Sequence, residues 1–185
     1  MRVIAGEQKG RRLVTPEGLH TRPTSDKVKE ALFSIIQFDL ADACFLDLFS
    51  GSGQMGIEAL SRGAKRSVFV DKDKKAIDCI NKNLKETGYV NKSYVHYGDV
   101  DSFLMSTKEK FDIVFLDPPY REDLINPIFE KVTEVCKKNA IIICEVLEKQ
   151  PLAENVNVFL LKRRYRYGKT ELALYRCSEA ETEIY

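Results

Sequence analysis

The segment Asp47-Leu-Phe-Ser-Gly51-Ser-Gly53-Gln-Met-Gly56 follows a short apolar run and leads into an amphipathic one. A G-x-G-x-x-G pattern between a strand and a helix is typical of Rossmann-like folds, because its glycines let a ligand approach the backbone closely. The segment therefore predicts a site for an adenosine cofactor at the end of the first strand of an α/β sheet.

Short β-branched runs alternate with amphipathic runs along the rest of the chain, which predicts helices on both faces of that sheet. We expect strands at residues 44–49, 67–70, 94–97, 111–116, 140–145, 156–161 and 171–176, and helices at 55–62, 74–87, 102–105 and 126–138. Residues 2–5 and 12–15 predict a hairpin, followed by a helix that Thr24 or Ser25 caps. We expect residues 1–40 to be an extension of one domain, whose main part is 41–185.

Composition excludes several classes of protein. The 185 residues hold 29 Lys and Arg against 28 Asp and Glu, so a uniformly basic surface is excluded and any surface for a polyanion must be local. The apolar runs are far shorter than the roughly 20 residues of a membrane span, and Met1-Arg2-Val3-Ile4 does not lead into a signal-peptide core. We therefore expect a cytoplasmic protein with no membrane association. Five widely spaced cysteines without a C-x-x-C pair predict reduced core thiols and no metal site.

Three acidic residues define the expected cofactor. Asp47, four residues before Gly51, would repel a pyrophosphate but suits the cationic groups of S-adenosylmethionine. Asp71, at the end of the second strand, is expected to bind the ribose hydroxyls, with Asp73 as an alternative that more naturally caps the next helix. Asp99 is expected to accept from the adenine amino group beside the Val100 amide, although a solvated turn aspartate is nearly as good an interpretation. The other expected cofactor contacts are Phe49, Gly51, Ser52, Gly53 and Lys72.

The motif Asp117-Pro118-Pro119-Tyr120 follows a buried strand directly, at the edge where open α/β sheets bind ligands. Its prolines stiffen the backbone and remove two N–H donors, so that carbonyl groups can face a ligand. The Asp117 carboxylate and the Pro118 carbonyl can then accept the hydrogens of an exocyclic amine, while Tyr120 stacks on the base. The motif therefore predicts methyl transfer to an amino group.

These motifs resemble those of S-adenosylmethionine-dependent Rossmann-like methyltransferases that act on amino groups, in which a Phe-x-Gly-x-Gly loop accompanies an Asn/Asp-Pro-Pro-aromatic motif. The chain is most similar to the bacterial small-subunit ribosomal RNA guanine-N2 methyltransferase family. The resemblance rests on the two motifs together with Arg2-Val-Ile-Ala-Gly6, Lys9-Gly-Arg-Arg-Leu13, Arg22-Pro-Thr-Ser-Asp-Lys-Val28 and Tyr167-Gly-Lys-Thr170.

The resemblance implies a seven-stranded mixed sheet of order 3-2-1-4-5-7-6 with strand seven antiparallel. It also implies methylation of a guanine of 16S ribosomal RNA, in an assembling small subunit, with Asp117 as a catalytic residue. We expect a monomer. Asp71 stands where many members have Glu, which we expect to change cofactor affinity rather than chemistry.

Two basic clusters are expected to contact RNA. The run 162–169 holds five cations and two tyrosines without an acid, a composition that suits phosphates and stacked bases. We expect both clusters to flank one cleft beside Asp117, although water-facing residues would show the same pattern, and Arg22 would equally suit bracing the active-site loop. The cations are Lys162, Arg163, Arg164, Arg166 and Lys169 in this run, and Lys9, Arg11, Arg12 and Arg22 near the amino terminus.

Other functions stay open from the sequence alone. An amino methyltransferase acting on adenine N6 or on a glutamine side chain would use the same Asp117 motif. An NAD-dependent oxidoreductase explains the glycines but neither Asp47 nor the Asp117 motif, and a non-catalytic RNA-binding module leaves the acidic residues without a role.

Overall fold

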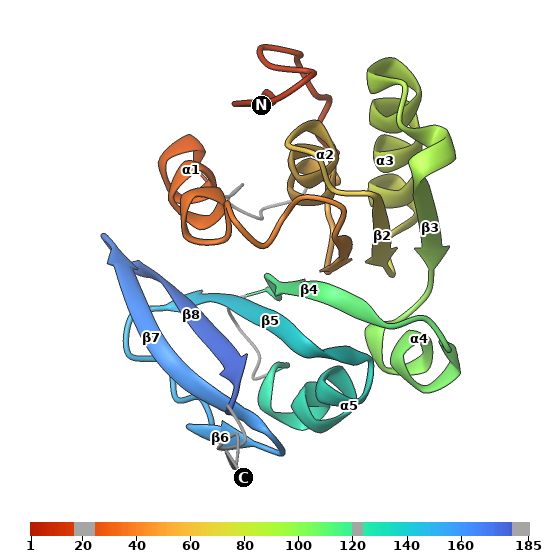
Figure 1. The fold of residues 1–185 in the computed structure, drawn as a ribbon. Coiled ribbons are helices and arrows are strands. Elements are labelled where there is room, and N and C mark those ends of the chain that lie inside the picture. Colours follow the sequence, from red (N-terminus) through yellow and green to blue (C-terminus); the bar gives the residue numbers. More distant parts are fainter. Residues whose placement is uncertain (17–24, 120–123, 179–185) are drawn as a thin grey trace, which may run out of the picture.

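The computed structural model describes residues 1–16, 25–119 and 124–178. Within these residues one sheet has the order β3-β2-β1-β4-β5-β8-β7-β6 (Figure 1). Strands β1 to β5 are parallel, whereas β8 is antiparallel to β5 and β7 is antiparallel to β8. The strands are β1 Cys44–Leu48, β2 Arg66–Asp71, β3 Ser93–Tyr97, β4 Phe111–Leu116, β5 Cys136–Leu147, β6 Asn155–Val156, β7 Phe159–Tyr167 and β8 Thr170–Cys177. The helices are α1 Asp26–Ile35, α2 Gln54–Ser61, α3 Lys74–Thr87, α4 Val100–Ser106 and α5 Phe129–Glu134, with short 3-10 turns η1 Val90–Lys92 and η2 Asn126–Ile128.

The predicted sheet order and its antiparallel seventh strand are confirmed, but the number of strands is corrected. The segment 156–161, expected as one strand, is divided between β6 and β7. Asn157 lies between them with a φ of 52°, in the left-handed region that asparagine tolerates in tight turns. The chain reverses there, so the basic run lies within β7 and the turn after it.

The central strands are buried on both faces, as expected of parallel strands between two helical layers. Helices α1, α2 and α3 cover one face, which we call the α1 face; there α1 packs on Phe45, Phe115 and Leu172 of the sheet. Helices α4 and α5 cover the opposite face, where Leu46 and Leu116 are buried. Alternate residues of each strand therefore belong to different cores.

The helix expected at 126–138 was too long. Helix α5 ends at Glu134 and β5 begins at Cys136. The Phe111 amide donates to the Val135 carbonyl at 2.9 Å, and the Lys137 ammonium donates to Asp112 at 2.7 Å. These contacts with β4 hold the polar end of β5 extended, which the local sequence pattern does not reveal.

Residues 1–16, which we call the N-terminal arm, fold as a hairpin with one antiparallel bridge between Arg2 and Arg12. Val3 and Leu13 of the arm pack against α2 and α3. The next described segment is α1, which Ser25 caps by accepting from the Val28 amide at 3.3 Å. Thr24, the other expected cap, lies outside the described residues.

Glu58 of α2 joins this arm to the helices. Its fully buried carboxylate accepts from the Ile4 and Ala5 amides at 2.8 and 3.0 Å. It also forms ion pairs with Arg62 at 2.8 Å and with the fully buried Lys29 at 3.6 Å. The arm is therefore fixed to α2 by a buried charged network.

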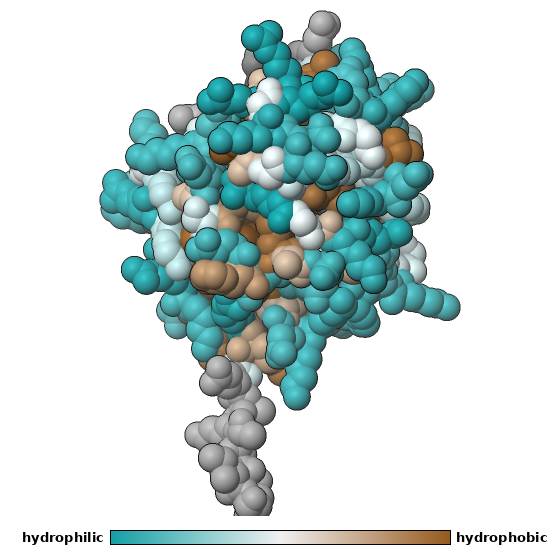
Figure 2. Space-filling model, turned by 45° about the horizontal axis from the view of Figure 1, so that its top comes forward, coloured by the Kyte–Doolittle hydropathy of each residue, from teal (hydrophilic) through white to brown (hydrophobic). Residues whose placement is uncertain are grey.

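Charged and polar residues cover most of the surface seen in Figure 2, around a small central area of hydrophobic residues. Among the helices of the described residues, none is both long and apolar enough to cross a membrane.

Candidate functional site

The glycine loop joins β1 to α2 through three residues in the left-handed region of backbone conformation. Phe49, Gly51 and Gly53 have φ values of 64°, 56° and 75°. A Cβ atom on Gly51 would meet nothing within 4 Å, so the loop has open space beside it. A Cβ on Gly56 would lie 2.3 Å from a ring carbon of Phe69, so Gly56 is needed for α2 to pack on the sheet. Gly51 and Gly56 therefore serve ligand approach and packing respectively.

Asp47 lies beneath this loop, with only 1% of its surface exposed. Its carboxylate accepts from the Gly56 amide at 3.0 Å, at the beginning of α2. Burial raises the pKa of Asp47 well above its ordinary value, and the nearby Asp71 carboxylate raises it further, while the Gly56 hydrogen bond opposes the rise. A cationic ligand would relieve this unfavourable burial of negative charge.

Asp71 ends β2 beside the same loop. One carboxylate oxygen accepts from the Gly51 amide at 2.8 Å, and the other accepts from the Asp73 amide at 2.8 Å. Burial raises the pKa of Asp71, and these backbone donors limit the rise. Asp73 caps α3 by accepting from the Lys75 amide at 2.8 Å. This agrees with the expectation that Asp73 caps the helix after the second strand. A carboxylate offers about four acceptor positions, so the backbone hydrogen bonds to Asp71 leave room for a ribose hydroxyl.

Asp99 is the N-cap of α4. Its two oxygens accept from the backbone amide and the hydroxyl of Ser102 at 2.8 and 2.7 Å, and the backbone hydrogen bond is the main cause of its lowered pKa. Asp99 is exposed and Val100 is buried, while Lys72 is exposed beside Asp71. The Asp99 carboxylate therefore has a structural role as a cap whether or not it meets an adenine.

The Asp117 corner lies directly beside the glycine loop. Leu116 of β4 pairs with Leu48 of parallel β1, so the residues that follow them, Asp117 and Phe49, leave neighbouring strands at the same level. Neighbouring strands are roughly 4.8 Å apart. Asp117 is partly exposed, Pro118 is buried and Pro119 is exposed. Tyr120 lies outside the described residues. The corner is thus both accessible and adjacent to the expected cofactor site.

Glu145 is a candidate that sequence reasoning did not single out. Cys144 of β5 pairs with Leu116 of β4, so Glu145 stands level with Asp117 on the next strand. Only 3% of its surface is exposed. Its signal was available in the sequence as a single acid inside the apolar run 140–147.

The basic run in β7 is divided between the two faces of the sheet. Arg164 pairs with Glu171 at 2.7 Å and Arg166 with Glu148 at 2.8 Å, so neighbouring segments supply acids that the run itself lacks. Arg163 lies over the Tyr165 ring at 5.0 Å, and Tyr165 packs against the core of the α1 face. The exposed cations of the run are Lys162, Arg163, Arg166 and Lys169.

Arg11 and Arg12 of the N-terminal arm lie near Glu86, at the end of α3. The Arg11 guanidinium donates to the Glu86 carbonyl, in the last turn of α3. That end of α3 is remote from Asp71, whereas Asp117 is at the same edge of the sheet as Asp71. A cleft beside Asp117 flanked by both basic clusters therefore cannot include Arg11. Lys9 and Arg12 are exposed, and Arg22 lies outside the described residues.

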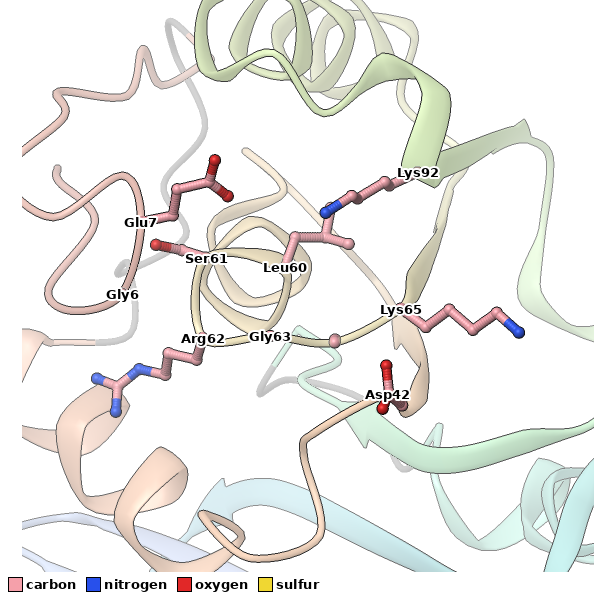
Figure 3. Close-up of a pocket in the computed structure, with 10 residues that line it drawn as sticks. Gly6, Glu7, Asp42, Leu60, Ser61, Arg62, Gly63, Lys65 and Lys92 are labelled. Carbon is pink, nitrogen blue, oxygen red and sulfur yellow. The ribbon is translucent and has the colours of Figure 1, made fainter.

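A surface hollow of about 480 Å³ lies between the arm and the end of α2 (Figure 3). Glu7, Arg62, Lys65 and Lys92 supply its charged side chains together with Asp42. It opens at the end of α2 remote from the glycine loop, and its Arg62 is already paired with Glu58. The hollow is therefore separate from the corner formed by Asp117 and the glycine loop.

Sheet order, the glycine loop and the Asp117 corner together define the Rossmann-like fold of class I methyltransferases. The structure described as "Putative methyltransferase yhhF from Escherichia coli" matches with a TM-score of 0.86 and 32% identity, covering 96% of this chain and 98% of that one. A family model described as "Conserved hypothetical protein 95" matches residues 1–176, and the chain belongs to that family.

Several relatives align with most of the chain, among them one from Bacillus subtilis and one from Haemophilus influenzae. The Bacillus subtilis protein named "Putative rRNA methyltransferase YlbH" is 38% identical over 95% of this chain and 98% of its own length. The Haemophilus influenzae protein named "Ribosomal RNA small subunit methyltransferase D" is 37% identical over 89% of this chain and 88% of its own length.

Proposed function

We propose that the protein transfers the methyl group of S-adenosylmethionine to the exocyclic N2 amine of a guanine in small-subunit (16S) ribosomal RNA. The observation that carries the proposal is the pairing of Leu48 with Leu116, because it brings the Asp117 motif, which suits an amine, next to the glycine loop, which suits an adenosine cofactor. The names of the B. subtilis and H. influenzae relatives support an RNA substrate. We further propose that the protein acts in the cytoplasm, as a monomer, on an assembling subunit, and that residues 1–40 belong to the same domain as 41–185.

The cofactor suits the residues present. The open space at Gly51 admits a ligand to the backbone, and the buried carboxylates of Asp47 and Asp71 favour a cation. Bound S-adenosylmethionine supplies an electrophilic methyl group on its sulfonium sulfur. In the proposal Asp71 binds the ribose, Asp99 and the Val100 amide bind the adenine, and the remaining contacts are Phe49, Ser52, Gly53 and Lys72.

Asp117 and the Pro118 carbonyl are proposed to accept the two N2 hydrogens of the guanine. The amine lone pair is delocalised into the ring, and two acceptors on its hydrogens favour a pyramidal nitrogen with that pair directed at the methyl carbon. The new N–C bond forms as the C–S bond breaks, and Asp117 then accepts the proton that the nitrogen loses. Positioning supplies most of the rate. Pro119 stiffens the corner and Tyr120 is proposed to stack on the base.

Replacing Asp47 with asparagine separates cofactor binding from stability. The amide oxygen can still accept from Gly56, so we expect the variant to be at least as stable as the wild type at neutral pH. Its affinity for S-adenosylmethionine should fall by about tenfold or more, because a charge-assisted contribution is lost. Calorimetric titration and thermal unfolding measure the two effects, and a loss of stability without a loss of affinity would contradict the proposal.

The pH dependence follows from the raised pKa values of Asp47 and Asp71. A carboxyl group with a raised folded-state pKa contributes stability below its ordinary pKa, and that stability is lost as pH rises through the folded value. A cationic ligand favours the ionised form, so wild-type cofactor affinity should rise with pH above the ordinary carboxyl range. The rise should be smaller in the Asp47→Asn variant.

Salt dependence tests which cations bind RNA. Each phosphate contact contributes about 0.7 to the slope of log affinity against log salt for single-stranded nucleic acid. We expect Arg163→Ala to reduce the slope by about that amount. Arg164→Ala is the matched control; it should leave the slope unchanged and lower stability, because it leaves the buried Glu171 without its partner. Equal slopes in the wild type and Arg163→Ala would place the RNA elsewhere.

The proposed function itself is tested by mass spectrometry of ribosomal RNA from a strain lacking the protein. We expect one guanine of small-subunit RNA to lose its N2 methyl group, and purified protein with labelled cofactor to restore it on small-subunit particles. Unchanged guanine-N2 methylation in the deletion strain would overturn the proposal, and loss of methylated adenine instead would support the adenine alternative.

A further inference from the structure

Glu145 extends the Asp117 corner by one strand. The pairings Leu48 with Leu116, and Leu116 with Cys144, set three neighbouring parallel strands in register at the level where β1 and β4 end, while β5 continues to Leu147. The residue after Leu116 is Asp117 and the residue after Cys144 is Glu145. The two acids therefore occupy neighbouring positions on adjacent strands, whose backbones lie roughly 4.8 Å apart.

Both positions face the same helical layer. Phe115 and Ile143, two residues before Asp117 and Glu145 respectively, belong to the core of the α1 face, and Leu172, which pairs with Glu145, does as well. Side chains two residues apart along a strand point to the same face. Asp117 also precedes a proline, which favours extended backbone and continues the alternation. The α1 face therefore presents two acids beside each other at this edge.

Leu172 of β8 connects these acids to the RNA surface proposed above. It belongs to a row of paired positions that crosses β4, β5, β8 and β7. Leu172 pairs with Glu145 on one side and with Tyr165 on the other, so the row continues to the tyrosine that Arg163 covers. The row therefore runs from the Asp117 corner to Tyr165 and to Arg163, one of the exposed cations of β7. Glu145 stands between the proposed reacting amine and the proposed RNA backbone contact.

Burial makes a carboxylate at this position costly unless it accepts hydrogen bonds. Glu145 is 3% exposed, and it and Asp117 each already have an interaction in the structure. A carboxylate offers about four acceptor positions, so such an interaction leaves capacity for a ligand. A second acid beside Asp117 is suited to a ligand edge that presents several donors in a row.

We propose that Glu145 is a specificity-determining residue that accepts the N1–H of the target guanine while Asp117 accepts from its N2 amine. This inference rests on the proposed function. Guanine presents N1–H and N2–H donors side by side on its Watson–Crick edge, the edge that enzymes read in an extruded base. Adenine has an acceptor at N1, so its ring nitrogen would face a buried carboxylate without a hydrogen between them. Glu145 thereby selects guanine over adenine.

The test compares guanine with 2-aminopurine at the target position of small-subunit particles, once mass spectrometry has located that position. 2-Aminopurine keeps the 2-amino group but has an acceptor at N1. We expect the wild type to methylate guanine at least about 10³-fold faster than 2-aminopurine, since buried groups built to bind a hydrogen reject analogues that lack it. Glu145→Gln can accept from guanine N1–H or donate to 2-aminopurine N1, so its preference should fall to about tenfold or less.

The control variant is Glu171→Gln, which replaces another buried acid, in β8, whose partner Arg164 lies on the opposite face from Tyr165. It should keep the wild-type preference even if it is less stable. The absent O6 of 2-aminopurine affects all variants alike and cancels in the comparison. An unchanged preference in a folded Glu145→Gln variant would overturn the proposal.

Two further results separate the possible failures. A wild-type enzyme that methylates both RNAs at similar rates overturns the role of Glu145 without any variant. A wild-type enzyme that methylates neither, with guanine present and unmethylated in the particles, overturns the proposed function itself.

Discussion

Asp117→Ala should lower the rate of methyl transfer by about 10³-fold, the scale seen when one positioned group at a reaction centre is removed. The reason is the geometry of the corner, where Asp117 leaves β4 level with the glycine loop after β1. Affinity for S-adenosylmethionine should be unchanged, because the proposed partner of the Asp117 side chain is the amine and not the cofactor. Single-turnover methylation and calorimetric titration of the cofactor measure the two quantities.

Two asparagine variants sharpen this prediction. Asp117→Asn keeps a carbonyl acceptor but loses the charge, so its rate should lie between those of the wild type and Asp117→Ala. Asp112→Asn, at the other end of β4, keeps an acceptor for the Cys44 amide and should be fully active. A fully active Asp117→Ala enzyme would show that Asp117 is not essential.

Glu58→Ala should lower the free energy of unfolding by about 3–5 kcal/mol, the range expected when one member of a buried ion pair is removed. The substitution leaves Lys29 buried without its nearest opposite charge, and the Ile4 and Ala5 amides without their acceptor. Burial already lowers the pKa of Lys29, and Glu58 opposes that shift. Denaturant unfolding of the full chain measures the loss.

Removing both charges should cost less than removing one. Lys29→Met combined with Glu58→Met leaves no uncompensated buried charge on this pair and should recover much of the stability lost in Glu58→Ala. Glu109→Ala breaks the more exposed pair with Arg66 and should change the free energy of unfolding by no more than about 1 kcal/mol. A Glu58→Ala variant as stable as Glu109→Ala would contradict the proposed role of the network.

Much of the fold could be predicted because its signals are local. The strand before Gly51, the helix after it and the strand ending at Leu116 each follow from runs of neighbouring residues. The order of the strands came from the family resemblance. Local pattern failed where a neighbour in space overrode it, as at 136–138, which β4 holds extended, and at Asn157, where one left-handed residue divides a strand.

In the candidate site, too, some features could be predicted from local sequence and others were decided by neighbours in space. Asp47, Asp71 and Asp117 were found from their places beside strand ends, and the structure sets all three at one edge. The basic run could not be interpreted from its own residues, because the acids that pair with Arg164 and Arg166 come from other segments. The side-chain hydrogen bonds of Asp99 to Ser102 likewise assign it a capping role that its spacing alone left open.

The amino-acid sequence alone determined the class of fold, the loop that suits an adenosine cofactor and the motif that suits an amine, since each depends on residues within a few positions of one another. Only the tertiary structure decided which acids stand together. The pairing of β1, β4 and β5 brings Asp117 beside the glycine loop and Glu145 beside Asp117, and such register between strands distant in the chain is set by packing of the whole sheet.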